Sequence, residues 1–595
     1  MFDKKNNQND IILSAFLSFF CVYGLSREYV VGESSFVKAN SFFTLLLWII
    51  LSALFYQIKK NLVFQEVYSS FPGAVILALS QRIGAEFSAT KSLNLHNKNF
   101  YITCLAITIV FMSLFILLFR YWQTITKVLR KSILNRWSEK ISNSNKFYFI
   151  IWIGLLICWI PAFLAVYPGI YSYDAGPQVW QIFAKAGLSA HHPVIHTLLL
   201  DGCFYLGHAI TGNYNTGLLI YTLVQSVFMA ACFAYAIYYM KKNRVLPIIQ
   251  LVAFVFFAFN PINQIWVMTT TKDTIFAGFF LVLLVETWES VIHTEDFFAS
   301  KKKVVKYVIT AILMCLFRNQ GIYVLALLVP FVVFTMKKYR KQFLVILLIP
   351  IVVVKVITGP ISNMLGIESA NPREALSVPI QQLARAVTMN PDKVSEEEKE
   401  VIYQYIPKEY VDTYNPVTSD TVKEGFNRDL FEKDSKTFFK TWLSVGLKNK
   451  GIYLDSFLFG SYGYFYMDES PYWISFILYD GAWLDEGQNI LNIQRESKFP
   501  LYDKYLRAVS YGLVQERVPV ISTVSNEAFP FWILVVVASV LLYQRKLKKL
   551  LPLLLVFGFW GTMLLGPLIA IRYAYPIIVC VPSMLAVLYY ENNNK

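Results

Sequence analysis

Long apolar runs recur along the chain and are separated by short polar or basic loops. Most of these runs approach the length of about 20 residues that a helix needs to cross the hydrocarbon core of a membrane. The pattern therefore predicts an all-α polytopic membrane protein with about 12–14 transmembrane helices. The clearest crossings are expected at residues 11–25, 42–56, 100–119, 145–166, 216–240, 246–266, 272–291, 304–317, 321–336, 342–358, 530–544, 550–567 and 570–590. The run at 71–87 is either a short crossing or a helix at the membrane interface.

Polar stretches divide the chain into four expected segments. Residues 1–144 hold extra N-terminal transmembrane helices and a basic cytoplasmic loop, and residues 145–358 form the main transmembrane module. Residues 359–528 are polar over a long distance, which predicts a mostly helical extracytoplasmic soluble domain. Residues 529–595 return to apolar runs and add the C-terminal transmembrane helices.

The stretch at 193–210 is apolar enough to cross the membrane, but it contains an aspartate and two histidines. If it crossed, the basic cluster that follows at 241–244 would lie outside, against the excess of Lys and Arg in cytoplasmic loops. We therefore expect residues 167–215 to form one outer loop that holds amphipathic or half-buried helices.

Composition agrees with the membrane assignment. Hydrophobic residues make up 56% of the 595 positions, charged residues make up 16%, and the mean hydropathy is +0.47, whereas a soluble domain carries about 25% charged residues. The net charge of +15 resides in clusters between apolar runs. Such clusters are typical of cytoplasmic loops, so no nucleic-acid partner is expected. The seven cysteines are scattered, and neither a disulfide framework nor a zinc site is predicted.

Asp174 is the first candidate for chemistry. It lies in PGIYSYDAGP, where glycine and proline on both sides favour a turn just outside the helix at 145–166. A carboxylate placed there could accept the proton of an attacking sugar hydroxyl. Asp174 could equally cap a helix that starts near Gly176. The neighbouring Tyr171 and Tyr173 are candidate substrate contacts.

Three of the six histidines lie close together in AHHPVIHTLLLD, at His191, His192 and His196. His192 and His196 are four residues apart, which is a metal-ligand spacing on a helix. Pro193 is also typical of the first position of a helix, which would place His192 at a cap. Contact with a phosphate or a sugar is favoured for these side chains, and a divalent metal is left open as the one cofactor.

Further polar residues are expected at the outer ends of helices. Lys272 and Asp273 begin an apolar helix, and ionisable residues at such positions are functional candidates unless they merely pair or cap. Arg318 stands in LFRNQGIYV with Asn319 and Gln320. A guanidinium on the outer side suits the phosphate of a lipid carrier because it can bind two oxygens at once.

Arg572 is a second arginine at an outer helix end, followed by Tyr573 in GPLIAIRYAYPI. It is assigned to substrate binding, with an anchor in an interfacial aromatic belt as the alternative.

The order of these elements resembles the GT-C superfamily of polyprenyl-phosphate-dependent glycosyltransferases. The resemblance rests on a helix, an outer loop with an early aspartate, and a His-Pro element in YSYDAGPQVWQIFAKAGLSAHHPVIHTLLL (171–200). His192-Pro193 resembles the His/Lys-Pro-Pro element of that superfamily, with Val194 in place of the second proline. The YDAGPQ, HHP, RNQG and RY-YP elements are also similar to those of a bacterial family of multipass membrane proteins of unknown function.

The resemblance implies a GT-C-like helical bundle in the cell membrane, with Asp174 in an outward-facing active site. Its implied partners are a lipid-linked sugar donor and a glycan polymer or protein acceptor. The sequence has neither a GxxxxGK[ST] loop nor a GxGxxG motif opening a helix, which fits a donor drawn from lipid. The alternatives are a transporter or flippase of a lipid-linked or small-molecule substrate, and a membrane scaffold or sensor without enzymatic activity.

Overall fold

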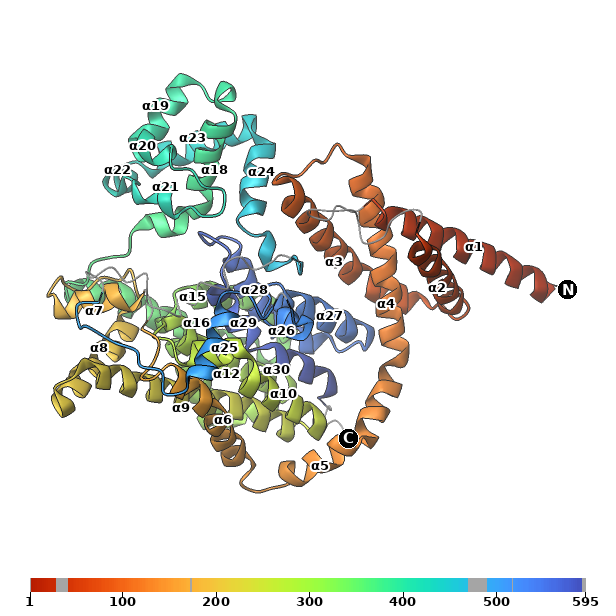
Figure 1. Cartoon of the computed structure of the whole chain (residues 1–595), viewed down its shortest axis with the longest axis horizontal. Helices are drawn as coiled ribbons and strands as arrows, with labels where there is room; N and C mark the ends of the chain where they lie inside the picture. The colour runs from red at the N-terminus through yellow and green to blue at the C-terminus, as the bar shows by residue number, and fades with distance from the viewer. Residues whose placement is uncertain (1, 28–40, 172–173, 469–488, 516, 591–595) are drawn as a thin grey trace.

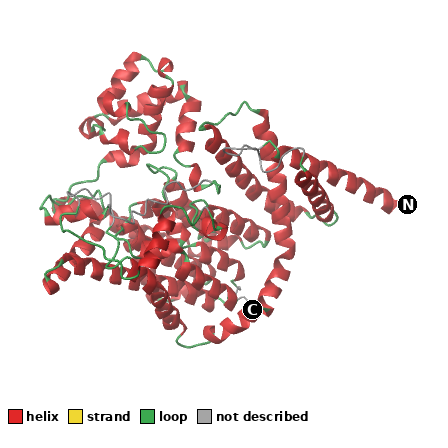
Figure 2. Cartoon of the chain, viewed as in Figure 1, coloured by secondary structure: helices red, strands yellow, loops and turns green. Residues whose placement is uncertain are grey.

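The computed structural model describes the chain except for residues 1, 28–40, 172–173, 469–488, 516 and 591–595. The described residues form helices joined by loops, with isolated bridges and no strand among them (Figure 2). In this part of the chain nine helices are long and apolar enough to cross a membrane, or ten if one bent pair counts as a span. The chain is therefore an all-α, multi-pass membrane protein. The candidate spans are fewer than the 12–14 expected, since several predicted crossings form helices that are too short.

Five helices precede the main bundle, and the first four stand beside it in Figure 1. They are α1 (Phe2–Leu25), α2 (Phe42–Lys59), α3 (Phe64–Thr90), α4 (Lys98–Lys131) and α5 (Ile133–Ser142). The run at 71–87 is the middle of the continuous helix α3, which packs against α4 and against a C-terminal helix, α27 (Phe529–Tyr543). Helix α5 lies at the opposite side of the bundle from the helical domain described below (Figure 1).

The main bundle has helices at the crossings expected between residues 145 and 358, but one of these crossings is divided and two are shorter than a membrane span. Its helices are α6 (Phe147–Ala165), α7 (Ala175–Phe183), α8 (Val194–Thr211), α9 (Tyr214–Lys242), α10 (Pro247–Phe259), α11 (Pro261–Val267), α12 (Lys272–Ile292), α13 (Thr294–Ala299), α14 (Lys301–Phe317), α15 (Gln320–Thr335), α16 (Arg340–Val356) and α17 (Ser362–Met364). Helix α12 is central, because it packs on α9, α14 and the C-terminal helix α29 (Ile571–Ile578) and is buried along nearly its whole length.

Two predicted segments of the bundle have a different structure from the one expected from the sequence. The run at 246–266 was expected as one crossing, but α10 and α11 meet at a bend of 55°. The bend follows from Asn260, whose side chain accepts a hydrogen bond from the backbone N–H of Ile262 at 3.0 Å and so starts a new helix. Helix α8, placed by the sequence argument in an outer loop, is 18 residues long and apolar enough to span a membrane.

A separate helical domain follows α17 and has its own hydrophobic core. It consists of α18 (Ser377–Met389), α19 (Glu396–Tyr405), α20 (Lys408–Val411), α21 (Asp420–Glu424), α22 (Arg428–Lys433), α23 (Ser435–Lys448) and α24 (Lys450–Phe459). Figure 1 shows this domain on one side of the bundle. The chain then returns to the bundle through α25 (Pro500–Ser510), α26 (Pro519–Val524), α27, α28 (Leu553–Met563), α29 and α30 (Val581–Ala586).

Candidate functional site

Two loops that lie about a hundred residues apart in the sequence are joined by backbone hydrogen bonds. The N–H of Ile170 donates to the carbonyl of Met268 at 2.9 Å, and the N–H of Thr270 donates to the carbonyl of Ile170 at 3.0 Å. Gly169 allows this approach, because a Cβ at that position would collide with the hydroxyl of Thr222 on α9. The bridge brings the loop that carries Asp174 beside the loop that begins α12.

The start of α12 presents two charged side chains in different directions. The hydroxyl of Thr271 caps the helix by accepting from the N–H of Asp273 at 3.4 Å. Lys272 and Asp273 are successive residues, so their side chains project about 100° apart and do not pair with each other. Each instead has a partner from another part of the chain, which is a pairing that the sequence argument did not anticipate.

Each carboxylate oxygen of Asp174 forms an ion pair with a different cation. Oδ2 lies 3.0 Å from Nζ of Lys272, and Oδ1 lies 3.1 Å from a guanidinium nitrogen of Arg572 on α29. Asp174 precedes α7 but makes no capping hydrogen bond, so its carboxylate serves these cations and not the helix. Burial by itself would raise the pKa of Asp174, but the charges of Arg572 and Lys272 outweigh it and hold that pKa well below its usual range.

His192 completes this cluster as a neutral ring. Nζ of Lys272 donates to its Nδ1 at 3.0 Å, which places the ring proton on Nε2. Burial, reinforced by the charge of Lys272, lowers the pKa of His192 to about 2. The side chains of Lys272, Arg572 and Asp174 remain 16%, 17% and 10% exposed, so solvent reaches part of the cluster.

A second, closed ion pair lies next to the first. Arg318, at the end of α14, contacts Asp273 at 2.7 Å, and their side chains are only 8% and 1% exposed. The Nε of Arg318 also donates to the side-chain oxygen of Gln320 at 3.1 Å. Arg318 is therefore committed to Asp273 and is less available to a ligand than the sequence argument expected.

Tyr573 contacts the guanidinium groups of both Arg572 and Arg318. Its hydroxyl accepts from Arg572 at 2.8 Å, and its ring centroid lies 4.7 Å from the guanidinium carbon of Arg572 and 5.2 Å from that of Arg318. Such cation–π contacts favour a fixed guanidinium orientation. Counting Asp174, Asp273, Lys272, Arg318 and Arg572, three cations face two carboxylates. Among these five side chains positive charge is in excess, which suits an anion.

His196 belongs to a buried network behind the site. Its Nε2 lies 2.8 Å from the hydroxyl of Tyr221, and its Nδ1 lies 3.0 Å from the amide nitrogen of Gln178. Tyr221 in turn donates to the side-chain oxygen of Gln225 at 2.9 Å. The amide nitrogen of Gln225 donates to the carbonyls of Val267 and Thr269, both at 2.8 Å. The network thus holds the loop that ends in Lys272.

The sequence analysis did not identify three residues of this network, namely Gln178, Tyr221 and Gln225. The available signal was the spacing of Tyr221 and Gln225, which are four residues apart in a largely apolar helix. Side chains at that spacing lie on one face, and polar groups within a crossing usually have a structural or functional partner.

The remaining candidates lie at the edge of the site or apart from it. His191 is exposed, and its ring packs against that of His192 with centroids 4.7 Å apart. Asn319 is exposed, whereas Tyr171 is buried against Phe204 of α8. Tyr173 lies outside the described residues.

The metal-ligand spacing of His192 and His196 does not produce a shared site. His192 lies in the loop before α8 and meets Lys272, whereas both ring nitrogens of His196 are occupied by Gln178 and Tyr221. Among the described residues, no group of three or more His, Cys, Asp or Glu side chains is placed to hold a metal ion.

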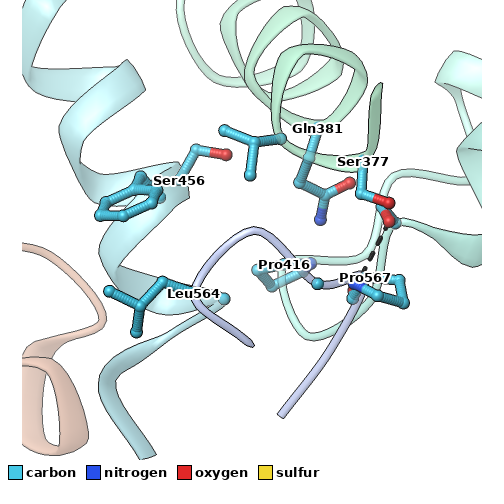
Figure 3. A pocket seen from close by; sticks show the side chains of 11 residues that line it. Ser377, Gln381, Pro416, Ser456, Leu564 and Pro567 are labelled. Carbon is cyan, nitrogen blue, oxygen red and sulfur yellow. Dashed lines mark hydrogen bonds between the residues drawn. The ribbon is translucent and has the colours of Figure 1, made fainter. Parts of the chain in front are cut away.

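The helical domain and the segment that leads into it contact the loop that carries His192 and the loop before α29. The N–H of Ala190 donates to the carbonyl of Glu368 at 2.8 Å, and the N–H of Ser419 donates to the carbonyl of Pro567 at 3.0 Å. Figure 3 shows the second junction, where Ser377 and Gln381 of α18 face Pro567 across a small pocket. Its volume of about 20 Å³ has room for little more than one water molecule. The junction is therefore a packing contact and is too small for a sugar.

The depressed pKa of Asp174 leads to a pH prediction. A group whose pKa is lower in the folded state stabilises the fold above its unfolded pKa, which is about 3.9 for Asp, and loses that contribution as the pH falls through the folded value. We expect the difference in melting temperature between the wild type and Asp174→Asn to stay constant from pH 7 to about 4.5 and to shrink below about 3.9. Thermal unfolding followed by tryptophan fluorescence in detergent measures it. A difference that already shrinks between pH 7 and 5 would contradict the double ion pair.

The network behind the site leads to a stability prediction. Tyr221→Phe leaves Gln225 without its donor and His196 without its acceptor, and each unsatisfied buried group costs about 1–3 kcal/mol. We expect a measurably lower melting temperature. Tyr205→Phe on α8 is the matched control, because the Tyr205 side chain is 54% exposed. Equal effects of the two substitutions would argue against the network.

Comparison with known proteins identifies a family whose function is unknown. The family model described as "Family of unknown function (DUF6020)" matches residues 183–595. No curated protein and no solved structure matches the chain. The matched region includes His192, Lys272, Arg318 and Arg572 and begins shortly after Asp174.

Proposed function

The chain belongs to the DUF6020 family, and because that family has no assigned activity, we propose from the site alone that the protein is a membrane glycosyltransferase with a GT-C-like architecture. It moves a sugar from a polyprenyl-phosphate donor to a cell-envelope acceptor, a glycan polymer or a protein. The reaction takes place at the outer side of the cell membrane.

The observation that carries the proposal is the carboxylate of Asp174 held between Lys272 and Arg572 at 3.0 and 3.1 Å. A pair of cations that holds a carboxylate also suits the oxygens of a phosphate, which makes the same charge-assisted hydrogen bonds. Lys272 and Arg572 are partly exposed, and the two cations share one carboxylate. An incoming phosphate can therefore compete with Asp174 for its two cations.

The distribution of basic residues supports the outward orientation. The basic segments 241–244, 301–303, 337–341 and 545–549 lie around the C-terminal end of α12, where Lys242 and Lys303 both pair with Glu289 at 2.6 and 2.9 Å. Lys272 begins the same helix at its other end. Because basic loops prefer the cytoplasm, this distribution supports an outward-facing Asp174 site.

The proposed reaction is a displacement at the anomeric carbon. The acceptor hydroxyl oxygen forms a bond to that carbon while the bond from the carbon to the phosphate oxygen breaks. The electron pair of the broken bond leaves with polyprenyl phosphate, whose added negative charge Lys272 and Arg572 stabilise. The proton of the acceptor hydroxyl moves to Asp174.

Phosphate binding also prepares Asp174 for this role. While Arg572 and Lys272 pair with it, their charges hold its pKa well below the usual range despite burial, and it is a weak base. When the donor phosphate takes over the two cations, that stabilisation of the carboxylate is lost and its pKa rises. A base is thus generated when the donor arrives.

The test is reconstitution of the full chain in liposomes with radiolabelled polyprenyl-phosphate hexoses and a delipidated envelope fraction as acceptor. We expect label to pass to the acceptor with release of one polyprenyl phosphate for each sugar, and no consumption of nucleotide sugars. Donors that neither react nor raise the melting temperature across a panel of sugars would contradict the proposal.

One observation favours transport as the second candidate. Asp201 lies on α8, is 1% exposed, and neither of its carboxylate oxygens has a hydrogen-bond partner among the described residues. Carboxylates within membrane-spanning helices are rare and often mark ion or substrate pathways. Movement of an intact lipid-linked sugar between leaflets, without release of polyprenyl phosphate, would favour this alternative.

A further inference from the structure

A cavity of about 830 Å³ lies at the C-terminal end of α12, at the opposite end of that helix from the Asp174 site. Three segments line it: residues 291–296 at the end of α12 and the start of α13, residues 335–339 after α15, and residues 545–549 in the turn between α27 and α28. These segments are far apart in the sequence, so the fold assembles the cavity from separate parts of the chain, two of which are basic.

The lining is strongly cationic. Its two acidic residues, Glu295 and Asp296, face six basic ones: Lys337, Lys338, Arg545, Lys546, Lys548 and Lys549. Lys338 pairs with Glu295 at 2.8 Å, and Arg545 donates to the side-chain oxygen of Gln65 at 3.0 Å. For Lys337, Lys546 and Lys548 no ion pair is found within the described part of the chain. The cavity therefore holds positive charge that the protein does not balance locally.

Lys549 is built into the wall and is not a surface lysine. It is 2% exposed, its Nζ donates to the carbonyl of Tyr590, and its own carbonyl accepts from the indole N–H of Trp288 at 3.2 Å. Burial, with the neighbouring charge of Lys546, lowers the pKa of Lys549 to about 7. An anion beside these two amines would favour their charged forms.

Apolar side chains stand exposed at the same place. Leu547 lies between the lysines of the turn and is 60% exposed, and Phe334, next to the lining residue Thr335, is 75% exposed. A cationic cavity beside exposed hydrocarbon suits an amphiphile that puts its headgroup in the cavity and its chain against the helices. The chemistry of both parts thus matches a phosphate carried by a membrane lipid.

We propose that this cavity is a second binding site, which takes the phosphate group of an anionic ligand at the basic side of the protein. The ligand is bound by Lys337, Lys546 and Lys548, with Lys549 behind them. A phospholipid headgroup and a soluble organic phosphate share this chemistry, and the lipid is favoured by Leu547 and Phe334. The site is independent of the proposed sugar transfer.

The test measures ligand retention by the full chain in detergent, with native mass spectrometry and thermal unfolding. The probes are phosphatidylglycerol, phosphatidylcholine and glycerol phosphate. We expect retention of phosphatidylglycerol over phosphatidylcholine and a higher melting temperature with the former. The double variant Lys546→Gln/Lys548→Gln should weaken phosphatidylglycerol binding by a factor of about 10–30, from about 1 kcal/mol for each lost cation.

The matched control removes the same charge from another basic loop, in Lys301→Gln/Lys302→Gln, where both lysines are exposed and outside the cavity. This variant should change binding by less than a factor of two. Equal weakening by both double variants would show attraction to surface charge and overturn the proposal, as would failure of every phosphate probe to bind. Binding of glycerol phosphate as tight as that of the lipid would support the phosphate site and assign it a soluble ligand.

Discussion

Replacing Asp174 with asparagine is expected to lower the rate of sugar transfer by a factor of about 10²–10⁴, the range for a lost general base. Asparagine has almost the shape of aspartate, so Lys272 and Arg572 keep a polar neighbour, but the amide cannot take the acceptor's proton. The measurement is the initial rate of label transfer in liposomes at saturating donor. Asp412→Asn, an exposed position in the helical domain, is the matched control and should leave the rate unchanged.

A measurement of donor binding by Asp174→Asn distinguishes a loss of catalysis from a loss of folded protein. Asp174→Asn removes the group that competes with the donor phosphate for two cations, so the variant should bind polyprenyl-phosphate donor at least as tightly as the wild type. A variant that binds donor and transfers sugar at more than a tenth of the wild-type rate would remove Asp174 from the role of base. A variant that binds no donor would contradict the competition between carboxylate and phosphate.

Breaking the closed ion pair should give the largest loss of stability. Asp273→Asn leaves the guanidinium of Arg318 buried without its anion, and removing one member of a buried pair costs about 3–5 kcal/mol. The apolar double variant Asp273→Leu/Arg318→Met removes both charges and should recover most of that loss, since a well-packed apolar pair often replaces a buried ion pair without cost. Thermal unfolding in detergent measures both variants.

The exposed pair of Lys338 and Glu295 provides the control. Their side chains are 74% and 75% exposed, and pairs of this kind contribute about 0–1 kcal/mol. Lys338→Gln should therefore shift the melting temperature little. If Asp273→Asn were as mild, or if the double variant were no more stable than the single one, the buried pair would not have the structural role assigned to it.

The order of helices could be read from the sequence because apolar runs of membrane length have few other solutions. The same reasoning grouped Asp174, His192, Lys272 and Arg572, since each lies at a helix end on the expected outer side. The bend at Asn260 was not predicted, because an asparagine followed by a proline in an apolar run does not indicate the angle between the two helices that it separates. The spanning length of α8 was visible, but charge statistics argued against a crossing.

The pairing inside the site could not be predicted from local sequence. Lys272 and Asp273 are adjacent, and only the tertiary contacts show that the lysine meets Asp174 while the aspartate meets Arg318. The hydrogen-bond network from Gln178 through Tyr221 likewise depends on contacts between separate helices. The basic loops were recognised as cytoplasmic signals, but a list of charges does not reveal that three segments enclose a cavity.

The attachment of the helical domain has a mechanical consequence. Two backbone hydrogen bonds, from Ala190 to Glu368 and from Glu368 to Leu188, fasten the segment that leads into the domain to the strip of chain that carries His192. A third, from Ser419 to Pro567, fastens the domain to the strip that leads to Arg572. A movement of the domain relative to the bundle would therefore act on both strips, which lead to two sides of the Asp174 cluster. In the proposed reaction, an acceptor bound to the domain would in this way be coupled mechanically to the charged cluster.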